Sequence, residues 1–309
     1  MHRFAVLTAA ATAILLFVGG LVTSTGSGLA VPDWPLSFGQ VFPAMVGGVL
    51  FEHGHRLVAT LVGLLTLVLA IWTVVAEQRP GVRALGLLAL FAVILQGVLG
   101  GVTVLYRLPL AVSVTHACLA QTFFCLTVAL ALVTGPAWAN AARSRSPARA
   151  QLAARATVAT AIVFLQLVLG ALVRHMGAGL AIPDFPLAFG RLVPPLVTPY
   201  VTAHFAHRVG ALAVACAIAS VVVTVLRHHR DDHQILRPAL LAMGLLLLQI
   251  TLGALIIWTH RAVTPTTAHL VVGASLLATS LVVTLRARRG LSAPAVAAPA
   301  PDFEPQVVT

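Results

Sequence analysis

Eight long apolar stretches constrain the fold of this 309-residue chain more than any other feature. A helix that crosses a bilayer needs about 20 mostly apolar residues. Stretches of that kind lie at roughly 4–22, 51–75, 84–105, 110–134, 152–173, 200–226, 236–258 and 264–285. They are long and do not alternate apolar with polar residues, which favours helices over the strands of a barrel. Hydrophobic residues make up 59% of the chain and charged residues only 9%, too apolar for an ordinary soluble domain. The sequence therefore predicts an all-α integral membrane protein with eight transmembrane helices.

The distribution of arginine predicts how the chain is oriented in the membrane. All nineteen basic residues are arginines, and most of them lie in alternate loops. The positive-inside rule then places both termini in the cytoplasm and the long loops 23–49 and 174–199 on the outer side. This bias accounts for the net charge of +11, so membrane lipid rather than nucleic acid is the expected partner. The first stretch is expected to be a retained helix, because its apolar run continues through Leu21 and Val22 without a small-residue cleavage site.

The chain repeats itself once. GSGLAVPDWPLSFG at 26–39 matches GAGLAIPDFPLAFG at 177–190, and LQGVLGG at 95–101 matches LQITLGA at 248–254. The offset stays between 151 and 153 residues, which predicts two tandem four-helix bundles related by a pseudo-twofold axis. The predicted division is a bundle at 1–134, a cytoplasmic linker at 135–151, a second bundle at 152–289 and a tail at 290–309. The tail is rich in Pro and Ala and is expected to be disordered.

Four histidines lie near the outer ends of four spans and form two matching pairs. They are His55, His116, His207 and His269. A titratable side chain within a span is costly and usually functional. Two imidazoles that face each other across a bundle can ligate a heme iron from both sides, so the pattern predicts two heme sites. Arg56 and Arg208 each follow a predicted ligand, and the sequence leaves open whether they bind heme propionates or extend toward the membrane surface.

Glu52 is the acidic residue that we place at a spanning helix. It precedes His55 by three positions, so both side chains project from one helical face. Its counterpart in the repeat is His204, so the two halves differ in chemistry at this position. A protein with one reactive site and one electron-carrying site would be expected to differ between its halves in this way. The alternative is a helix-start glutamate that pairs with Arg56 or satisfies backbone donors.

The repeated outer loops and several polar residues have less specific expectations. The Pro-Asp-aromatic-Pro strings at 32–35 and 183–186 cannot form regular helix. A lid over a site near the membrane surface is the functional interpretation, and a simple interfacial turn is the alternative. Gln96 and Gln249 are expected to bond between helices. No ligand role is assigned to the other outer histidines. The cysteines Cys118, Cys125 and Cys216 are interpreted as core-filling residues.

Taken together, these residues resemble the heme A synthase family. The matching features are the two four-helix halves, the Glu-x-x-His-Arg string at 52–56, the histidines His116, His207 and His269, and the GLAVPDWPLSFGQ loop. The resemblance covers about residues 4–286. It implies oxidation of a methyl group of heme O to a formyl group by two successive hydroxylations, giving heme A for cytochrome oxidase. Some family members carry paired cysteines in the outer loops, whereas both loops lack cysteine here, so a mechanism through loop thiols cannot operate in this chain.

The resemblance also implies roles for individual residues and partners. His55 and His116 would flank the substrate heme, His207 and His269 would ligate a resident heme b, and Glu52 would be the catalytic carboxylate. The implied location is the bacterial cytoplasmic (inner) membrane. The implied partners are heme O and an electron donor that the sequence does not identify, with heme O synthase and cytochrome oxidase assembly factors as further candidates. A diheme cytochrome b-type electron carrier is the main alternative, and a transporter is another.

Overall fold

The computed structural model describes residues 1–139 and 146–291, and within them it is built from helices. Eight helices are long and apolar enough to cross a membrane, which confirms the predicted all-α membrane architecture. Two short elements accompany them, α5 (Pro136–Ala139) and the 3-10 helix η1 (Ala178–Leu180). The eight long helices are α1 (His2–Ser24), α2 (Gly48–Ala76), α3 (Pro80–Leu105), α4 (Leu110–Val133), α6 (Pro147–His175), α7 (Pro199–His228), α8 (His233–Trp258) and α9 (Val263–Leu291).

The helices run beyond some of the predicted apolar stretches because polar caps set their ends. Helix α6 begins five residues before the predicted bundle boundary, since the Ser146 side chain accepts a hydrogen bond from the amide of Arg149 and Pro147 occupies the first turn. The predicted linker is therefore partly helical, at α5 and at the start of α6. Helix α9 extends to Leu291, so the first two residues of the predicted tail are helical too. The rest of the tail, 292–309, lies outside the described residues.

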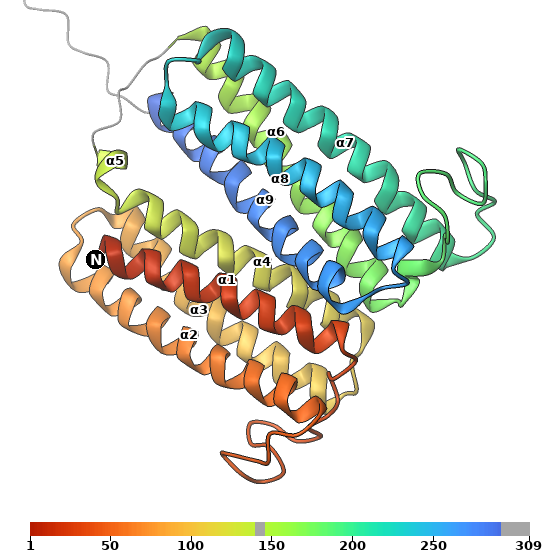
Figure 1. Cartoon of the computed structure of the whole chain (residues 1–309). Helices are drawn as coiled ribbons and strands as arrows, with labels where there is room; N and C mark the ends of the chain where they lie inside the picture. The colour runs from red at the N-terminus through yellow and green to blue at the C-terminus, as the bar shows by residue number, and fades with distance from the viewer. Residues whose placement is uncertain (140–145, 292–309) are drawn as a thin grey trace, which may run out of the picture.

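The eight spans pack in two groups of four that follow the repeat. In the first group α1 and α3 each contact α2 and α4, and in the second α6 and α8 each contact α7 and α9 (Figure 1). The groups meet along α1 and α4 on one side and α6 and α9 on the other. Leu16, Phe124 and Ala274 form part of a small apolar cluster at this junction. The packing is compatible with two tandem four-helix bundles.

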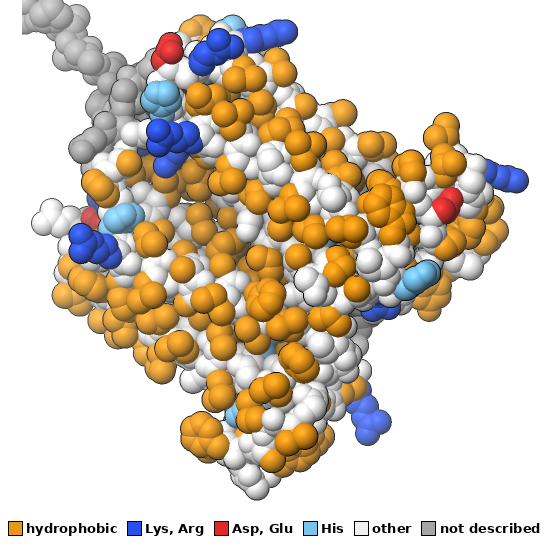
Figure 2. Space-filling view, viewed as in Figure 1, with side chains coloured by type: hydrophobic (Ala, Val, Ile, Leu, Met, Phe, Trp, Pro, Cys, Tyr) orange, Lys and Arg blue, Asp and Glu red, His pale blue; other side chains and the backbone are white. Residues whose placement is uncertain are grey.

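Different segments lie at the two ends of the molecule. The start of α1, the end of α9 and the short helix α5 lie at one end, and the two long loops lie at the other, called here the outer end (Figure 1). Apolar side chains cover the visible flanks of both groups, while charged side chains gather at the ends (Figure 2). Large apolar residues such as Leu61, Phe91 and Leu247 are more than half exposed in mid-helix, as expected for a surface that faces lipid.

Candidate functional site

The paired histidines lie on four different helices near the outer end. His207 on α7 and His269 on α9 face each other with ring centroids 6.4 Å apart and ring planes inclined by 64°. Two metal–nitrogen bonds of about 2 Å each, plus half a ring on each side, add to about 6 Å. The observed spacing therefore fits one iron between the two rings. Among the described residues, no group of three or more His, Cys, Asp or Glu side chains is placed to hold a metal ion.

The second pair is held through one nitrogen of each ring. Nδ1 of His269 donates to the main-chain carbonyl of Gln249 at 3.1 Å. Nδ1 of His207 lies 3.0 Å from the side-chain amide nitrogen of Gln166, which also donates to the His207 carbonyl at 2.7 Å. Nε2 of both rings has no hydrogen-bond partner in the described part of the chain. Metal-ligating histidines commonly donate their other ring N–H to an acceptor, as Nδ1 of His269 does, which leaves Nε2 for the metal.

The first pair is held less firmly. Nδ1 of His55 on α2 and Nδ1 of His116 on α4 are both buried without a hydrogen-bond partner. The Gln96 amide donates to the His116 carbonyl at 3.0 Å and lies 3.3 Å from Nε2 of the same ring. The expected bond of Gln96 between helices is thereby confirmed. Gln249 contacts its histidine through the main chain instead of the side chain.

Each of the four histidine rings packs against a glycine of a neighbouring helix. A methyl group added at Gly19 would lie 2.9 Å from Cε1 of His55, and one added at Gly170 would lie 3.0 Å from Cε1 of His207. The corresponding distances are 3.3 Å from Gly100 to His116 and 3.4 Å from Gly253 to His269. We call Gly19, Gly100, Gly170 and Gly253 the glycine cradle. A methyl group would crowd the imidazole most at Gly19 and Gly170 and least at Gly253, so glycine leaves room for the rings mainly at the first two positions.

Glu52 is buried and fully engaged beneath the first outer loop. One carboxylate oxygen accepts from the Arg56 guanidinium at 2.8 Å, and the other accepts from the Val31 amide at 2.9 Å. In the second half His204 occupies the same position, 3.3 Å from the Ile182 amide and 3.3 Å from the Arg208 guanidinium. A carboxylate accepts both bonds at once, whereas a neutral imidazole has one acceptor nitrogen. The structure thus shows the pairing with Arg56 that the sequence offered as an alternative to a catalytic role.

Both arginines that follow a predicted ligand fasten the outer loops. Arg56 donates to the carbonyls of Asp33 and Leu36, both at 2.8 Å. Arg208 donates to the carbonyls of Asp184 and Leu187, also at 2.8 Å. These bonds favour a loop-holding role for both guanidinium groups. Contact of either arginine with a heme propionate stays a prediction.

In both halves an aspartate side chain accepts hydrogen bonds from the backbone of its own outer loop. The Asp33 carboxylate accepts from the amides of Phe38 and Gly39 at 2.7 and 2.8 Å, and Asp184 accepts in the same way from Phe189 and Gly190. The Gly39 and Phe38 amides lower the pKa of Asp33 below its ordinary value, so this carboxylate is ionised at neutral pH. The carboxylate can therefore hold its loop in shape at neutral pH.

Each loop then folds back over the outer end of its own group. Trp34 lies so close to α3 that a methyl group at Gly101 would approach its ring within 2.6 Å. Phe185 packs edge-on against Trp258 of α8, with ring centroids 6.2 Å apart. These contacts favour the lid interpretation over a simple interfacial turn.

Ser37 makes two polar contacts beneath the lid that belong to the first half alone. Nδ1 of His53, a buried residue, lies 2.8 Å from the Ser37 hydroxyl of the first loop. The repeat replaces these two residues with Phe205 and Ala188. The first loop is therefore tied to its bundle by two polar contacts that the second lacks, because Arg56 also donates to the Ser37 hydroxyl at 3.3 Å.

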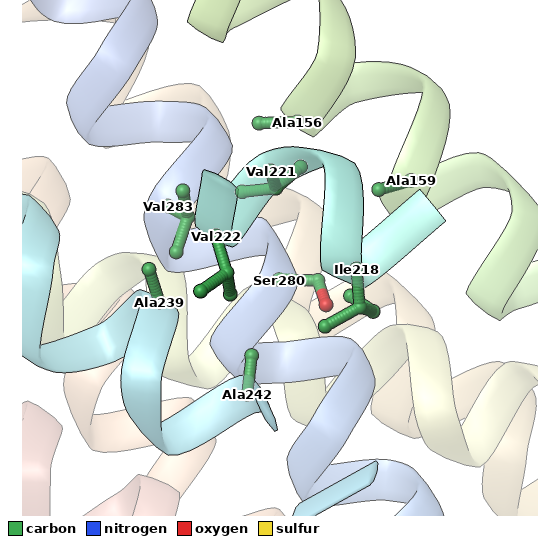
Figure 3. A pocket seen from close by; sticks show the side chains of 9 residues that line it. All are labelled: Ala156, Ala159, Ile218, Val221, Val222, Ala239, Ala242, Ser280 and Val283. Atoms are coloured by element: carbon green, nitrogen blue, oxygen red, sulfur yellow. The ribbon is translucent and has the colours of Figure 1, made fainter. Parts of the chain in front are cut away.

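A small apolar pocket lies well away from the histidines. Alanine and valine side chains from α6 to α9 line it together with Ser280, and Ile218 projects into it (Figure 3). Ile218 and Ser280 lie 11 residues beyond His207 and His269, about three helical turns. The pocket contains none of the candidate site residues.

Comparison with known proteins places these features in a family. The family model described as cytochrome oxidase assembly protein (COX15-CtaA) matches residues 47–281, which contain Glu52 and all four paired histidines. The chain belongs to this family. Curated relatives in the COX15-CtaA family include a heme A synthase of Symbiobacterium thermophilum, which is 36% identical over 82% of this chain and 86% of the relative.

Further relatives agree with the family assignment. A heme A synthase of Shouchella clausii is 30% identical over 85% of this chain and 88% of its own length. One of Geobacillus kaustophilus is 30% identical over 86% of this chain and 84% of its own length. The resemblance seen in the sequence is thus confirmed at the level of the COX15-CtaA family.

Some residues of the site escape a reading of the sequence alone. Gln166, Gly19 and Gly170 carry no local signal, because glycine is common in transmembrane helices and a single glutamine has several uses. The repeat offers the missing signal, since Gly19 and Gly170 are separated by 151 residues and Gly100 and Gly253 by 153. The paired histidines have the same spacing, 152 residues from His55 to His207 and 153 from His116 to His269.

Proposed function

We propose that this protein is a heme A synthase, which oxidises a methyl group of heme O to a formyl group by two successive hydroxylations. The observation that carries the proposal is the presence of two glycine-cradled histidine pairs that differ by one buried carboxylate. Relatives at 30 to 36% identity that bear the name heme A synthase support the same activity. The product would serve cytochrome oxidase, in keeping with the description of the family.

The two halves are proposed to divide the work. The second half, 152–289, holds a resident heme b between His207 and His269, and the first half, 1–134, holds heme O between His55 and His116. The support is a difference in the hydrogen bonds of the rings. Nδ1 has a hydrogen-bond partner in both histidines of the second pair and in neither histidine of the first pair. Fixed ligands suit a permanent cofactor, whereas a substrate has to enter and leave.

Heme iron supplies the redox chemistry when the sites are loaded. The protein's own part is to position the substrate and to control charge around the reacting carbon. Glu52 lies one helical turn from His55, so its carboxylate is placed to stabilise positive charge that develops on the methyl carbon as it is oxidised. The ion pair with Arg56 holds that carboxylate still and keeps the first loop closed over the site.

The proposed setting is the bacterial cytoplasmic (inner) membrane with both termini in the cytoplasm. The support is the bias of arginine toward alternate loops and the even number of spans. The proposed partners are heme O, membrane lipid and an electron donor. Heme O synthase and cytochrome oxidase assembly factors are candidates for delivery of the substrate and use of the product.

The activity is tested by feeding heme O to the purified protein with a reductant system and separating the extracted hemes. We expect an alcohol intermediate and then the aldehyde heme A. Bound heme at both sites without either product would refute the synthase proposal.

A diheme electron carrier of the cytochrome b type remains the competing function, and one observation favours it. Both Glu52 oxygens are occupied by loop and arginine donors, and His204 repeats the same docking in the other half. A purely structural carboxylate would show this pattern. The carrier would bind two hemes and reduce a partner without altering heme O.

Removal of either ligand in the second half should deplete the resident heme. We expect His207→Ala and His269→Ala each to lose most of the heme b, because one imidazole cannot replace the ligation provided by two. The measurement is the reduced-minus-oxidised spectrum of the purified variants together with extraction of their hemes. His55→Ala should leave this heme in place. Unchanged heme b in both second-half variants would contradict the assignment.

A further inference from the structure

Arg174 is a positively charged side chain placed where the two helix groups meet. It lies in the last turn of α6, and its Nη2 donates to the Gly20 carbonyl at 2.8 Å and to the Ser24 hydroxyl at 3.0 Å, both on α1. Ser24 also accepts from the Thr267 hydroxyl of α9 at 2.9 Å. The Nε and Nη1 groups of Arg174 make no hydrogen bond to the described residues. The guanidinium thus keeps donors available beside the second histidine site.

No carboxylate of the described chain compensates this charge. The ion pairs in that part of the protein join Arg56 to Glu52, Arg79 to Glu77 and Arg149 to Asp232. The two loop aspartates at the outer end are engaged by amides of their own loops. A cation that is removed from water is unfavourable unless an anion or a set of acceptors replaces the lost hydration. Arg174 is only partly exposed, and the two oxygen acceptors on its Nη2 replace part of the lost hydration.

Arg261 brings a second positive charge to the same place. It lies in the turn between α8 and α9, and its side chain passes 3.8 Å from the position of a methyl group added at Gly179. Arg174 is tied through Ser24 to Thr267, which lies two residues before His269 on α9, and Gly179 lies in η1, five residues after Arg174. In the first half the repeat places Thr23 and Leu108 at the corresponding positions, which are neutral. The cation pair is therefore a feature of the second half.

We propose that Arg174 and Arg261 form a carboxylate-binding site for the propionate groups of the heme held between His207 and His269. This inference rests on the proposed function, because it needs a heme in the second half. Arginine binds carboxylates through two parallel hydrogen bonds, and Arg174 has Nε and Nη1 available for them. Arg208, which the sequence suggested for this role, spends its Nη donors on loop carbonyls. The two cations also favour the reduced iron, since an added electron lowers the positive charge next to them.

The test is a potentiometric titration of the purified holoprotein. We expect Arg174→Gln and Arg261→Gln each to shift the reduction equilibrium of the resident heme about tenfold toward the oxidised form, a potential about 59 mV lower. Arg107→Gln is the matched control, since Arg107 lies in the equivalent turn of the first half. Ser24→Ala removes a hydrogen bond to Arg174 and keeps its charge. Both controls should leave the potential within about twofold of the wild-type equilibrium.

Three results would overturn the inference. The first is an unchanged potential in both arginine variants while heme b stays bound. The second is an equal shift in Arg107→Gln, which would show a general charge effect. The third is a wild-type potential that depends on anionic lipid and loses that dependence in Arg174→Gln, which would identify a lipid phosphate as the bound anion. If Arg174→Gln fails to assemble, Arg261→Gln, at an exposed turn, decides alone. Wild-type protein without heme b would refute the proposed function instead.

Discussion

Glu52→Ala should abolish the conversion of heme O while the resident heme b stays bound. Loss of one preorganised electrostatic contact at a developing charge costs about 100- to 1000-fold in rate, and we expect a fall of that size. Heme b should remain because its proposed ligands, His207 and His269, lie in the other helix group. The measurement is the yield of alcohol and aldehyde heme from added heme O, alongside the heme b spectrum of the same sample.

The repeat supplies the control that separates catalysis from loop docking. Glu52→His places in the first half the residue that the second half carries at the matching position, where it contacts the Ile182 amide. This variant should retain loop docking, measured as hydrogen exchange of residues 26–39, and still lack activity. A normal yield of heme A from Glu52→His would show that Glu52 only holds the loop and has no catalytic role. Fast exchange in both variants with equal loss of activity would assign the effect to the loop.

The sequence predicts those parts of the fold that depend on local, continuous patterns of residues. Spans follow from runs of apolar residues, and the tandem arrangement follows from a repeat with a nearly constant offset. The predicted start of α6 lies too late because the first residues of this helix include Arg149 and Gln151, so that hydropathy begins to rise only afterwards. The Ser146 cap and Pro147 mark the true start, and these signals are visible in the sequence once caps are sought.

The candidate ligands of the site stand out in the sequence, whereas the residues that surround them do not. His55, His116, His207 and His269 stand out because an imidazole is unusual within a span. The partners of Arg56 do not, since they are loop carbonyls some 20 residues away that only the folded loop brings near. For such a side chain the sequence specifies the donor and leaves the acceptor to tertiary structure.

Substitution of alanine for a glycine of the glycine cradle should also have a large effect, on heme binding. Gly170→Ala should deplete the resident heme b, because the added methyl group would lie 3.0 Å from the His207 ring and the ring would have to move. Overpacking of this kind costs about 1–3 kcal/mol, so heme retention should weaken about tenfold or more. Gly19→Ala, at 2.9 Å from His55, should instead lower conversion of heme O and leave heme b in place. The measurements are heme content per protein and product yield.

The order of the effects makes this prediction specific. Gly100→Ala and Gly253→Ala should be milder than Gly19→Ala and Gly170→Ala, since their methyl groups would lie 3.3 and 3.4 Å from the rings. Gly97→Ala on α3 and Gly244→Ala on α8 are the controls, as a methyl group there meets nothing within 4 Å. Alanine favours helix over glycine by about 1 kcal/mol, so loss of heme in a cradle variant cannot come from a weakened helix. Equal heme loss in Gly244→Ala and Gly170→Ala would mean that the cradle does not position the ligands.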